Sequence, residues 1–298
     1  MPTCAKDRLP CRPAGMGLGL SIVLAVSGSL PLMAGLPVRA PRGRQRIEYE
    51  TVSEFSHIRV RSQAGVRTLI FVRDNGDETE QSLLNVKKPY ELLEPYSRTM
   101  FLSYLFQPQP EQVLIIGLGG GAMVHFLKHY DPQLRVDAVE IDPAVVKIAD
   151  KYFDCRAGGN INLITADGIK YLETTETKYD VIYLDAFLKP TTDTDVVGAP
   201  LRMKTQEFYK MMQSKLRPAG VVVFNLNLHK TTDADLAAIR NAFARVYVFR
   251  TATANYVAIG TLTAAREPAA TLRSRAREAD SRFKASFSFQ ELLKHLRE

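Results

Sequence analysis

Apolar residues between positions 113 and 260 form short runs, which alternate with segments where apolar residues recur at helical spacing. The runs predict buried strands at 113–116, 136–139, 161–164, 179–184 and 221–226. The intervening segments predict helices at 122–130, 144–152, 205–216 and 233–244. Strands that alternate with helices form a mostly parallel sheet with helices on both faces. We therefore predict an α/β fold built on a Rossmann-like doubly wound sheet.

The flanking regions have other patterns. Residues 46–84 place apolar side chains at alternate positions around the turn signal Asp74-Asn75-Gly76, which predicts a small antiparallel β unit ahead of the sheet. Pro89 marks the expected start of a helix at 89–106. Runs at 246–250 and 256–259 have a short connection, which predicts an antiparallel closing strand. Residues after 263 are rich in Arg and Ala and then amphipathic, which is typical of a peripheral helical tail with a solvated face.

The predicted organisation has four parts: an N-terminal segment at 1–45, the β unit at 46–88, the α/β domain at 89–263 and the tail at 264–298. The first part contains a nearly continuous apolar run from Met16 to Gly35. It fits a signal peptide cleaved near Ala40, a membrane tether through residues 16–36, or a segment absent from the working protein because the gene model is overlong. The catalytic domain is accordingly expected in the cytoplasm, with or without an anchor, or outside the cell after export.

Charge and cysteine content exclude some classes of function. The 298 residues carry a formal net charge of +7, of which residues 1–40 contribute +3. No basic stripe with interleaved aromatic residues is present, so we expect no nucleic-acid partner. The three cysteines form neither a disulfide framework nor a set with metal-ligand spacing, so we expect no metal.

A glycine-rich turn follows the first buried run of the α/β domain. Glycines at 117, 119, 120 and 121 permit a tight turn and let the backbone approach a ligand closely. Glu140 lies about 20 residues further on, the spacing at which an acid reaches ribose hydroxyls. The pattern predicts a nucleoside site. Gly117-x-Gly119-x-x-Ala122 also fits an NAD-type fingerprint, and a structural glycine turn without a ligand is a further interpretation.

Acids end three successive strands of the predicted sheet: Glu140, Asp167 and Asp185. Ligands of such sheets bind beyond the carboxyl ends of the strands. Glu140 suits a ribose, and Asp167-Gly168 suits an adenine amino group, because a carboxylate accepts from an exocyclic N–H. Asp185 is left to face the reacting centre. Asp167 and Asp185 could instead cap helices or turns. The long loop at 188–203, which carries Asp193 and Asp195, is expected to act as a lid.

The chain resembles the spermidine synthase-like branch of the polyamine aminopropyltransferase family from about residue 48 to 260. The resemblance rests on S-E-F-S-H-I-R-V at 53–60, V-L-I-I-G-L-G-G-G at 113–121, V-E-I-D at 139–142, A-D-G at 166–168, Y-D-V-I-Y-L-D at 179–185, T-Q-E-F-Y at 205–209 and L-R-P-A-G at 216–220. It implies aminopropyl transfer from decarboxylated S-adenosylmethionine to putrescine, and a homodimer.

The resemblance also implies roles for individual residues. Asp185 matches the first catalytic aspartate of the family, Tyr96 the tyrosine near the amine nucleophile, and Gln81 a glutamine on the substrate side. The attacking amine must lose a proton, and a free alkyl amine has a pKa near about 10, so a positioned carboxylate can accept that proton. The implied nucleoside-binding residues are Gly117, Gly119, Gly120, Glu140, Asp142, Asp167 and Gly168.

Three positions depart from the family pattern. Gly120 and Leu188 stand where the family has aspartates, and Arg98 replaces a glutamate two residues after the tyrosine. The acids missing at Leu188 and Arg98 normally bind cationic amines, although Asp193 or Asp195 could substitute for them. Gly120 also removes a charge that would repel the carboxylate of intact S-adenosylmethionine.

The departures leave three hypotheses open. They are an aminopropyltransferase with an altered acceptor, a methyltransferase that uses intact S-adenosylmethionine, and a non-catalytic nucleoside-binding protein. An NAD enzyme is disfavoured, because the sequence lacks an evident second dinucleotide-binding half.

Overall fold

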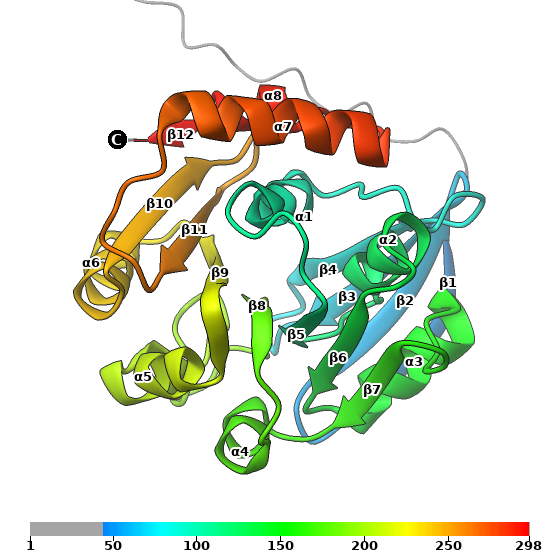
Figure 1. Cartoon of the computed structure of the whole chain (residues 1–298). Coiled ribbons are helices and arrows are strands. Elements are labelled where there is room, and N and C mark those ends of the chain that lie inside the picture. Colours follow the sequence, from blue (N-terminus) through cyan, green and yellow to red (C-terminus); the bar gives the residue numbers. More distant parts are fainter. Residues whose placement is uncertain (1–43, 298) are drawn as a thin grey trace, which may run out of the picture. The chain divides into compact units, whose positions relative to one another are not determined.

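The computed structural model describes residues 44–297, which form two β-sheets (Figure 1). The smaller sheet is antiparallel, in the order β1-β2-β3-β4. The larger sheet has the order β12-β10-β11-β9-β8-β5-β6-β7. The strands of the smaller sheet are β1 (Arg46–Val52), β2 (His57–Gln63), β3 (Val66–Val72) and β4 (Glu78–Asn85). They form the predicted antiparallel β unit.

Five neighbouring strands of the larger sheet run parallel: β5 (Gln112–Ile116), β6 (Arg135–Glu140), β7 (Ile161–Thr165), β8 (Tyr179–Leu184) and β9 (Leu216–Asn227). The other three pair antiparallel: β10 (Arg245–Arg250), β11 (Asn255–Thr261) and β12 (Leu296–Arg297). Every residue of the central strand β5 is buried, as expected for a strand covered on both faces. The prediction of a mostly parallel sheet with an antiparallel closing strand is confirmed.

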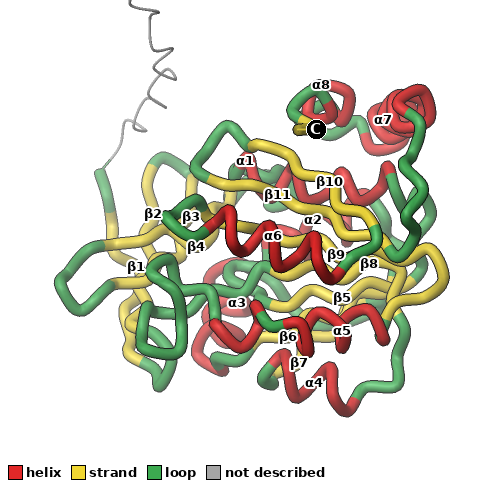
Figure 2. The backbone as a smooth tube through the Cα atoms, turned by 90° about the vertical axis from the view of Figure 1, so that its left-hand side faces the viewer, coloured by secondary structure: helices red, strands yellow, loops and turns green. Residues whose placement is uncertain are grey.

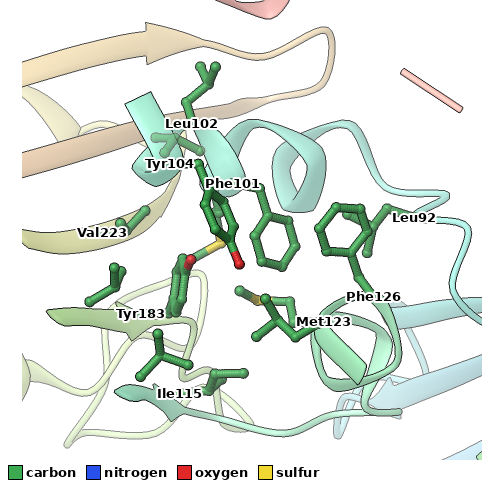
Figure 3. Close-up of a cluster of buried hydrophobic side chains, with 14 of the residues drawn as sticks. Leu92, Phe101, Leu102, Tyr104, Ile115, Met123, Phe126, Tyr183 and Val223 are labelled. Atoms are coloured by element: carbon green, nitrogen blue, oxygen red, sulfur yellow. The ribbon is translucent and has the colours of Figure 1, made fainter. Parts of the chain in front are cut away.

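Helices cover the two faces of this sheet (Figure 2). One layer contains α1 (Pro95–Met100), the 3₁₀ segment η1 (Phe101–Leu105), α2 (Ala122–Tyr130), α7 (Ala269–Phe283) and α8 (Phe289–Leu293). The other contains α4 (Gly168–Thr174), α5 (Gln206–Ser214) and α6 (Thr232–Ala242). In the first layer the rings of Phe101 and Phe126 stack with centroids 4.2 Å apart (Figure 3). The Phe101 ring also lies 5.6 Å from that of Tyr183 on β8, so the end of α1, the helix that carries Tyr96, is held against the sheet.

Helix α3 (Pro143–Phe153) links the cores of the two sheets, because its Ala149 belongs to the core of the larger sheet. Val145, Ile148 and Phe153 pack against the smaller sheet, whose contribution includes Val60 and Leu69. The small β unit is thereby held beside the end of β6, where α3 begins. This arrangement brings β4 to the ligand-binding edge of the larger sheet.

The predicted helix at 89–106 was wrong in its first third, residues 89–94. The α-helix begins at Pro95, and the chain tightens into the 3₁₀ segment η1 at Phe101. Glu94 is extended, with ψ 127°, because the ring of a following proline disfavours helical backbone at the residue before it. Pro95 itself fits the first helical position, where its missing N–H has no intrahelical partner.

Both ends of the chain bear on earlier predictions. Helix α7 buries Leu272, Ala276 and Phe283 in the core and leaves residues on its other side exposed. The alternatives for residues 1–43, the signal peptide and the tether among them, lie outside the described residues. No helix within residues 44–297 combines the length and the apolar character needed to cross a membrane.

Candidate active site

A cavity of about 670 Å³ opens at the carboxyl ends of the parallel strands, where ligands bind in open α/β sheets. Strand β4 lines one side and the loop at 188–203 another. The volume is in the range of small-molecule sites. Nine residues named from the sequence line this cavity: Gln81, Tyr96, Gly117, Gly119, Glu140, Asp167, Gly168, Asp185 and Asp193.

The glycine turn is shaped by close neighbours. Gly117 has φ +100°, and a Cβ there would overlap the carbonyl oxygen of Asp185. Gly120 has ordinary φ but equally little room, since a Cβ would lie 2.7 Å from the ring of Phe153 and 3.1 Å from Ser82 Cβ. The Gly120 N–H donates to Ser82 Oγ at 2.9 Å. Gly120 therefore lies behind the cavity wall, and Phe153 fills the space a side chain would need.

Glu140 occupies the end of β6 at the nucleoside side of the cavity. Its two carboxylate oxygens accept from the backbone N–H groups of Asp142 and Leu118, both at 3.0 Å. Burial raises the pKa of Glu140, while these hydrogen bonds oppose the rise. The carboxylate is thus fixed beside the glycine turn, with lone pairs left to accept from a ligand.

Asp167 can both cap a helix and contact a ligand, the two functions considered from the sequence. Its Oδ1 accepts from Ile169 N–H at 2.7 Å and caps α4. The same side chain lines the cavity, and Arg202 Nη1 lies 4.0 Å from Oδ2. A capping role therefore does not prevent Asp167 from contacting a ligand through Oδ2.

Asp142 lies away from the cavity. It is 1% exposed, its Oδ1 caps α3 by accepting from Ala144 N–H at 2.8 Å, and its Oδ2 accepts from Ser53 Oγ at 2.5 Å. Ser53 belongs to the segment between β1 and β2. Asp142 therefore joins the two sheets, which is a structural contact that sequence spacing alone did not distinguish from ligand binding.

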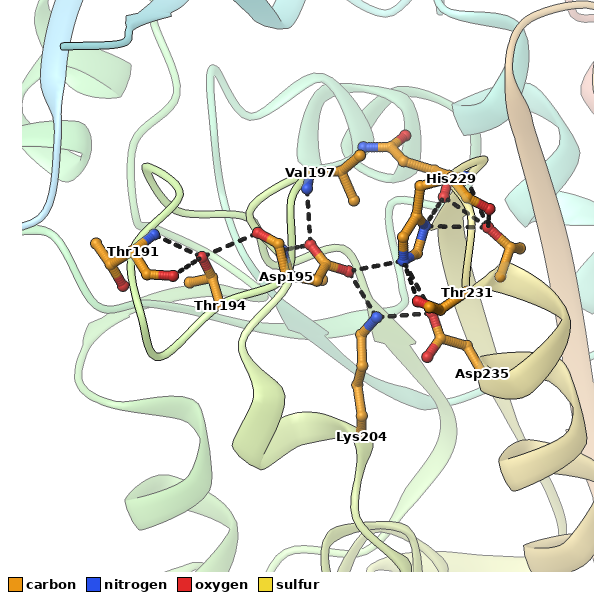
Figure 4. A network of polar contacts seen from close by, with 11 residues as sticks. Thr191, Thr194, Asp195, Val197, Lys204, His229, Thr231 and Asp235 are labelled. Carbon is orange, nitrogen blue, oxygen red and sulfur yellow. Dashed lines mark hydrogen bonds and ion pairs between the residues drawn. The ribbon is translucent and has the colours of Figure 1, made fainter.

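Asp195 also points away from the cavity, into an ionic network (Figure 4). Lys204 Nζ lies 2.6 Å from Asp195 Oδ2 and 2.7 Å from Asp235 Oδ2. His229 Nε2 lies 3.4 Å from the same Asp195 oxygen. Asp195, His229 and Asp235 have the separations of a metal-ligand set, but the Lys204 ammonium already contacts both carboxylates. The network ties the loop at 188–203 to α6.

Asp185 is the centre of the reactive half of the cavity. Its Oδ1 accepts from Asn225 Nδ2 at 2.8 Å, and its Oδ2 accepts from the Tyr96 hydroxyl at 3.4 Å. Loss of surrounding water raises the pKa of Asp185 to about 6, while both hydrogen bonds lower it. At neutral pH the group is an anion that takes up a proton readily, as a general base must.

Two acids that sequence reasoning missed, Glu80 and Glu94, line the same half. Within residues 44–297, no hydrogen bond or ion pair reaches either carboxylate. Burial, followed by the charges of Glu80 and Asp185, raises the pKa of Glu94. A β-bulge around Gln81 helps to explain the placement of Glu80, because consecutive residues of β4 then face the cavity. Glu94 reaches the cavity from the residue that precedes α1. Their positions beside Gln81 and Tyr96 in the sequence were the available signal.

Arg98 does not face the part of the cavity that Glu80, Glu94 and Asp185 line. Its Nε donates to the carbonyl oxygen of Leu92 at 2.7 Å, and its Nη2 donates to that of Leu93 at 3.3 Å. The guanidinium therefore stabilises the backbone of the two residues that precede Glu94. The replacement of the family glutamate at this position does not put a cation into the cavity.

Comparison with known proteins now identifies the family. The model of the spermine/spermidine synthase domain matches residues 96–266. A polyamine aminopropyltransferase of Vibrio vulnificus is 32% identical over 212 residues, which cover 70% of this chain and 69% of that enzyme. The chain belongs to the spermine/spermidine synthase family. It is accordingly a transferase.

Two further similarities put this family membership in context. A spermidine synthase in complex with the transition state analogue AdoDATO has TM-score 0.65 and 18% identity, with 85% of each chain covered, and so shows the same fold. A mouse eEF1A lysine and N-terminal methyltransferase is 32% identical over 147 residues, but these span only 47% of this chain and 21% of that enzyme. The broader coverage favours the aminopropyltransferases.

Proposed function

We propose that this member of the family transfers an aminopropyl group from decarboxylated S-adenosylmethionine to a polyamine-type acceptor. The observation that carries the proposal is the position of Asp185 in one cavity, between the Glu140–Asp167 side and the acidic side formed by Glu80 and Glu94. A nucleoside bound at the first side leaves its sulfonium arm to extend toward Asp185. A cationic acceptor fits the second side.

The reaction needs one proton transfer and one displacement. The acceptor ammonium gives a proton to the Asp185 carboxylate and becomes a neutral amine. The amine lone pair then attacks the carbon next to the sulfonium, the C–S bond breaks, and the electron pair stays on sulfur in methylthioadenosine. Tyr96, whose pKa is raised by burial and the neighbouring Asp185 charge, remains a neutral hydroxyl that can orient the carboxylate or the amine.

Glu80 and Glu94 supply negative charge where the family motifs lack it. The aspartate expected at Leu188 is absent, yet two unpaired carboxylates still face the acceptor side. Two cations of the loop at 188–203 line the cavity. Lys189 is paired with Asp74 of the β3–β4 turn, and Arg202 lies 4.0 Å from Asp167 Oδ2, on the nucleoside side. An ammonium group of the acceptor would therefore find uncompensated negative charge in a partly enclosed site, where charge pairing is stronger than in water.

We propose a homodimer from the family resemblance alone, and sedimentation analysis of the purified full chain would test it. The proposal for the N-terminal segment rests instead on the apolar run from Met16 to Gly35. The segment is a signal peptide, a tether, or absent from the working protein because the gene model is overlong, and fractionation with sequencing of the mature N-terminus would distinguish the three.

The deciding experiment incubates the purified full-length chain with polyamines and either decarboxylated or intact S-adenosylmethionine. Mass spectrometry then identifies the nucleoside released. Methylthioadenosine together with an aminopropylated amine supports the proposal, and the amine consumed names the acceptor. S-adenosylhomocysteine would instead establish methyl transfer, and absence of both products with bound nucleoside would exclude catalysis of either kind on these acceptors.

A further inference from the structure

A chain of hydrogen bonds leads from Asp185 along the wall of the cavity and has no counterpart in the sequence motifs. Asn225 lies near the end of β9 and Asn255 begins β11, and both side chains are buried. Asn255 Nδ2 donates to Asn225 Oδ1 at 2.9 Å, and Asn225 Nδ2 donates to Asp185 Oδ1 at 2.8 Å. Thr253 Oγ1 donates to Asn255 Oδ1 at 3.0 Å. The chain therefore runs from Thr253 through two amides to the carboxylate.

The sheet register explains why these side chains meet. In the antiparallel pair of β9 and β11, Asn255 lies opposite Asn227, and Val257 lies opposite Asn225. Residues 225 and 227 share one face of β9, and Asn255 on β11 is the diagonal neighbour of Asn225 on that face. Diagonal neighbours in a sheet lie within reach of each other's side chains. The closing strand thus supplies a buried group to the reactive half of the cavity.

The chemistry of the groups fixes their orientation. An ionised carboxylate only accepts hydrogen bonds, so the nitrogen end of Asn225 must face Asp185. Its oxygen end then needs a donor, which is the nitrogen of Asn255, and the Asn255 oxygen is satisfied by the Thr253 hydroxyl. Each bond polarises the next, which strengthens the donor presented to Asp185.

The two oxygens of Asp185 are held unequally. Oδ1 has the shorter bond, 2.8 Å to a buried amide, while Oδ2 has only the long 3.4 Å contact with the Tyr96 hydroxyl. An oxygen with a committed donor is the poorer site for an incoming proton. The arrangement leaves Oδ2 as the better acceptor, on the Tyr96 side of the carboxylate.

We propose that Asn225 and Asn255 are positioning residues, which orient Asp185 so that its Oδ2 accepts the proton of the amine. The inference rests on the proposed function for the identity of the proton donor. Asn225 acts by direct contact with the carboxylate, and Asn255 acts by holding the Asn225 amide in the required orientation.

The test compares pH profiles of kcat/KM for wild type, Asn225→Ala and Asn255→Ala. The Asn225 bond favours the ionised carboxylate, so its removal raises the pKa of Asp185, and the acid limb should move upward by about one pH unit in N225A. The shift should be smaller in N255A, because the direct donor remains but is free to rotate. Binding of methylthioadenosine, followed by calorimetry, should stay within about twofold of wild type in both variants.

The chain contains a matched control for the loss of an amide–carboxylate bond. Asn162 Nδ2 donates to Asp137 Oδ1 at 2.8 Å, outside the cavity. Asn162→Ala should leave the acid limb in place. An acid limb that does not move in N225A while nucleoside binding is retained would overturn the proposal. If N225A does not fold, N255A carries the test with its smaller expected shift.

A second measurement separates this inference from the proposed function. Carboxyl-¹³C-labelled protein reports the titration of Asp185 without turnover, and Asp185→Asn assigns the resonance. If wild type releases no methylthioadenosine, the proposed function fails, but a titration midpoint that rises in N225A still supports the positioning role. A midpoint equal to wild type overturns that role whatever the reaction is.

Discussion

The two halves of the cavity are built in different ways. We call the side with Glu140 and Asp167 the nucleoside half, and the side with Glu80, Glu94 and Asp185 the acceptor half. Gly117, Glu140 and Asp167 lie at the ends of β5, β6 and β7, which are consecutive in sequence and adjacent in the sheet. The acceptor half instead combines β4 of the small sheet, α1, the end of β8 and the closing strand β11. A local βαβ unit therefore specifies the first half, whereas the second requires the whole tertiary fold. Substitutions in each half show whether the two halves also act independently.

The largest effect is expected at Asp185. Asp185→Asn removes the proton acceptor and should lower kcat by about 10²- to 10⁴-fold. Methylthioadenosine affinity should not change, because Asn keeps the shape of the side chain and the nucleoside half is untouched. Single-turnover kinetics and calorimetry measure the two quantities. Full activity in D185N would remove Asp185 from the reaction.

The reciprocal test weakens the nucleoside half. The Glu140 carboxylate accepts from the N–H groups of Leu118 and Asp142 and still has an anionic oxygen to offer to a ribose. An uncharged Gln amide has only one accepting oxygen, so in Glu140→Gln the nucleoside affinity should fall about tenfold or more. Glu173→Gln, on the exposed surface of α4, is the control with the same change of charge. Unchanged affinity in E140Q would show that Glu140 only shapes the glycine turn.

Gly120→Asp, which restores the family aspartate, tests whether the glycine turn of the nucleoside half has room for a side chain. Because Phe153 and Ser82 fill the adjacent space, the variant should lose about 1–3 kcal/mol of unfolding free energy. Denaturant melts measure this loss. Phe153→Ala lowers the free energy of unfolding by itself. In the double variant with G120D, the loss of unfolding free energy should be smaller than the sum of the two single losses, because the smaller side chain makes room for the aspartate. A stable, fully active G120D would show that the turn adapts freely.

Glu94→Gln probes the acceptor half alone. Removal of one unpaired carboxylate should raise KM for a cationic amine about three- to tenfold at low salt, and less at high salt because ions screen the pair. Nucleoside affinity and kcat at saturating amine should stay near wild type. Glu80→Gln should behave similarly but more weakly, because Glu80 is more exposed. An equal rise in KM for an uncharged amine analogue would contradict charge pairing.

The smallest effect is expected in the lid. Lys204→Met leaves the neighbouring Asp195 and Asp235 carboxylates without their common cation, so the loop at 188–203 should open more often. Limited proteolysis within 188–203 should accelerate several-fold, with only about a twofold rise in KM. Asp74→Asn, which removes the exposed pair with Lys189, is the milder comparison. Equal proteolysis of K204M and wild type would show that the network does not restrain the lid.

Sequence patterns predicted what depends on local order. The buried runs and the glycine turn give the sheet, and the rule that ligands bind at strand ends brings Glu140, Asp167 and Asp185 together. The same patterns could not distinguish Asp142 from the acids that face the cavity. Asp142 caps α3 and accepts a hydrogen bond from Ser53. Asn225 ends an apolar run as those acids do, so the same rule applied to amides would have found it.

Contacts between distant segments account for the rest. The role of Asn255 depends on its antiparallel register with β9, which no local pattern encodes. Arg98 looked unfavourable for amine binding, but its donation to two backbone carbonyls turns it away from the cavity. Helix boundaries failed where a proline competed with periodicity, as at Pro95.

The position of β11 has a consequence for synthesis of the protein on the ribosome. This strand pairs with β9 and β10, and it follows both in the chain. Until it emerges, β9 exposes one edge of a strand whose residues Val221 to Phe224 are apolar and buried in the finished sheet. Unpaired apolar edges are templates for aggregation. Nascent chains that stop before residue 255 therefore lack the Asn255 side chain that holds Asn225, and they also lack the cover of this edge. We expect such chains to depend on chaperones.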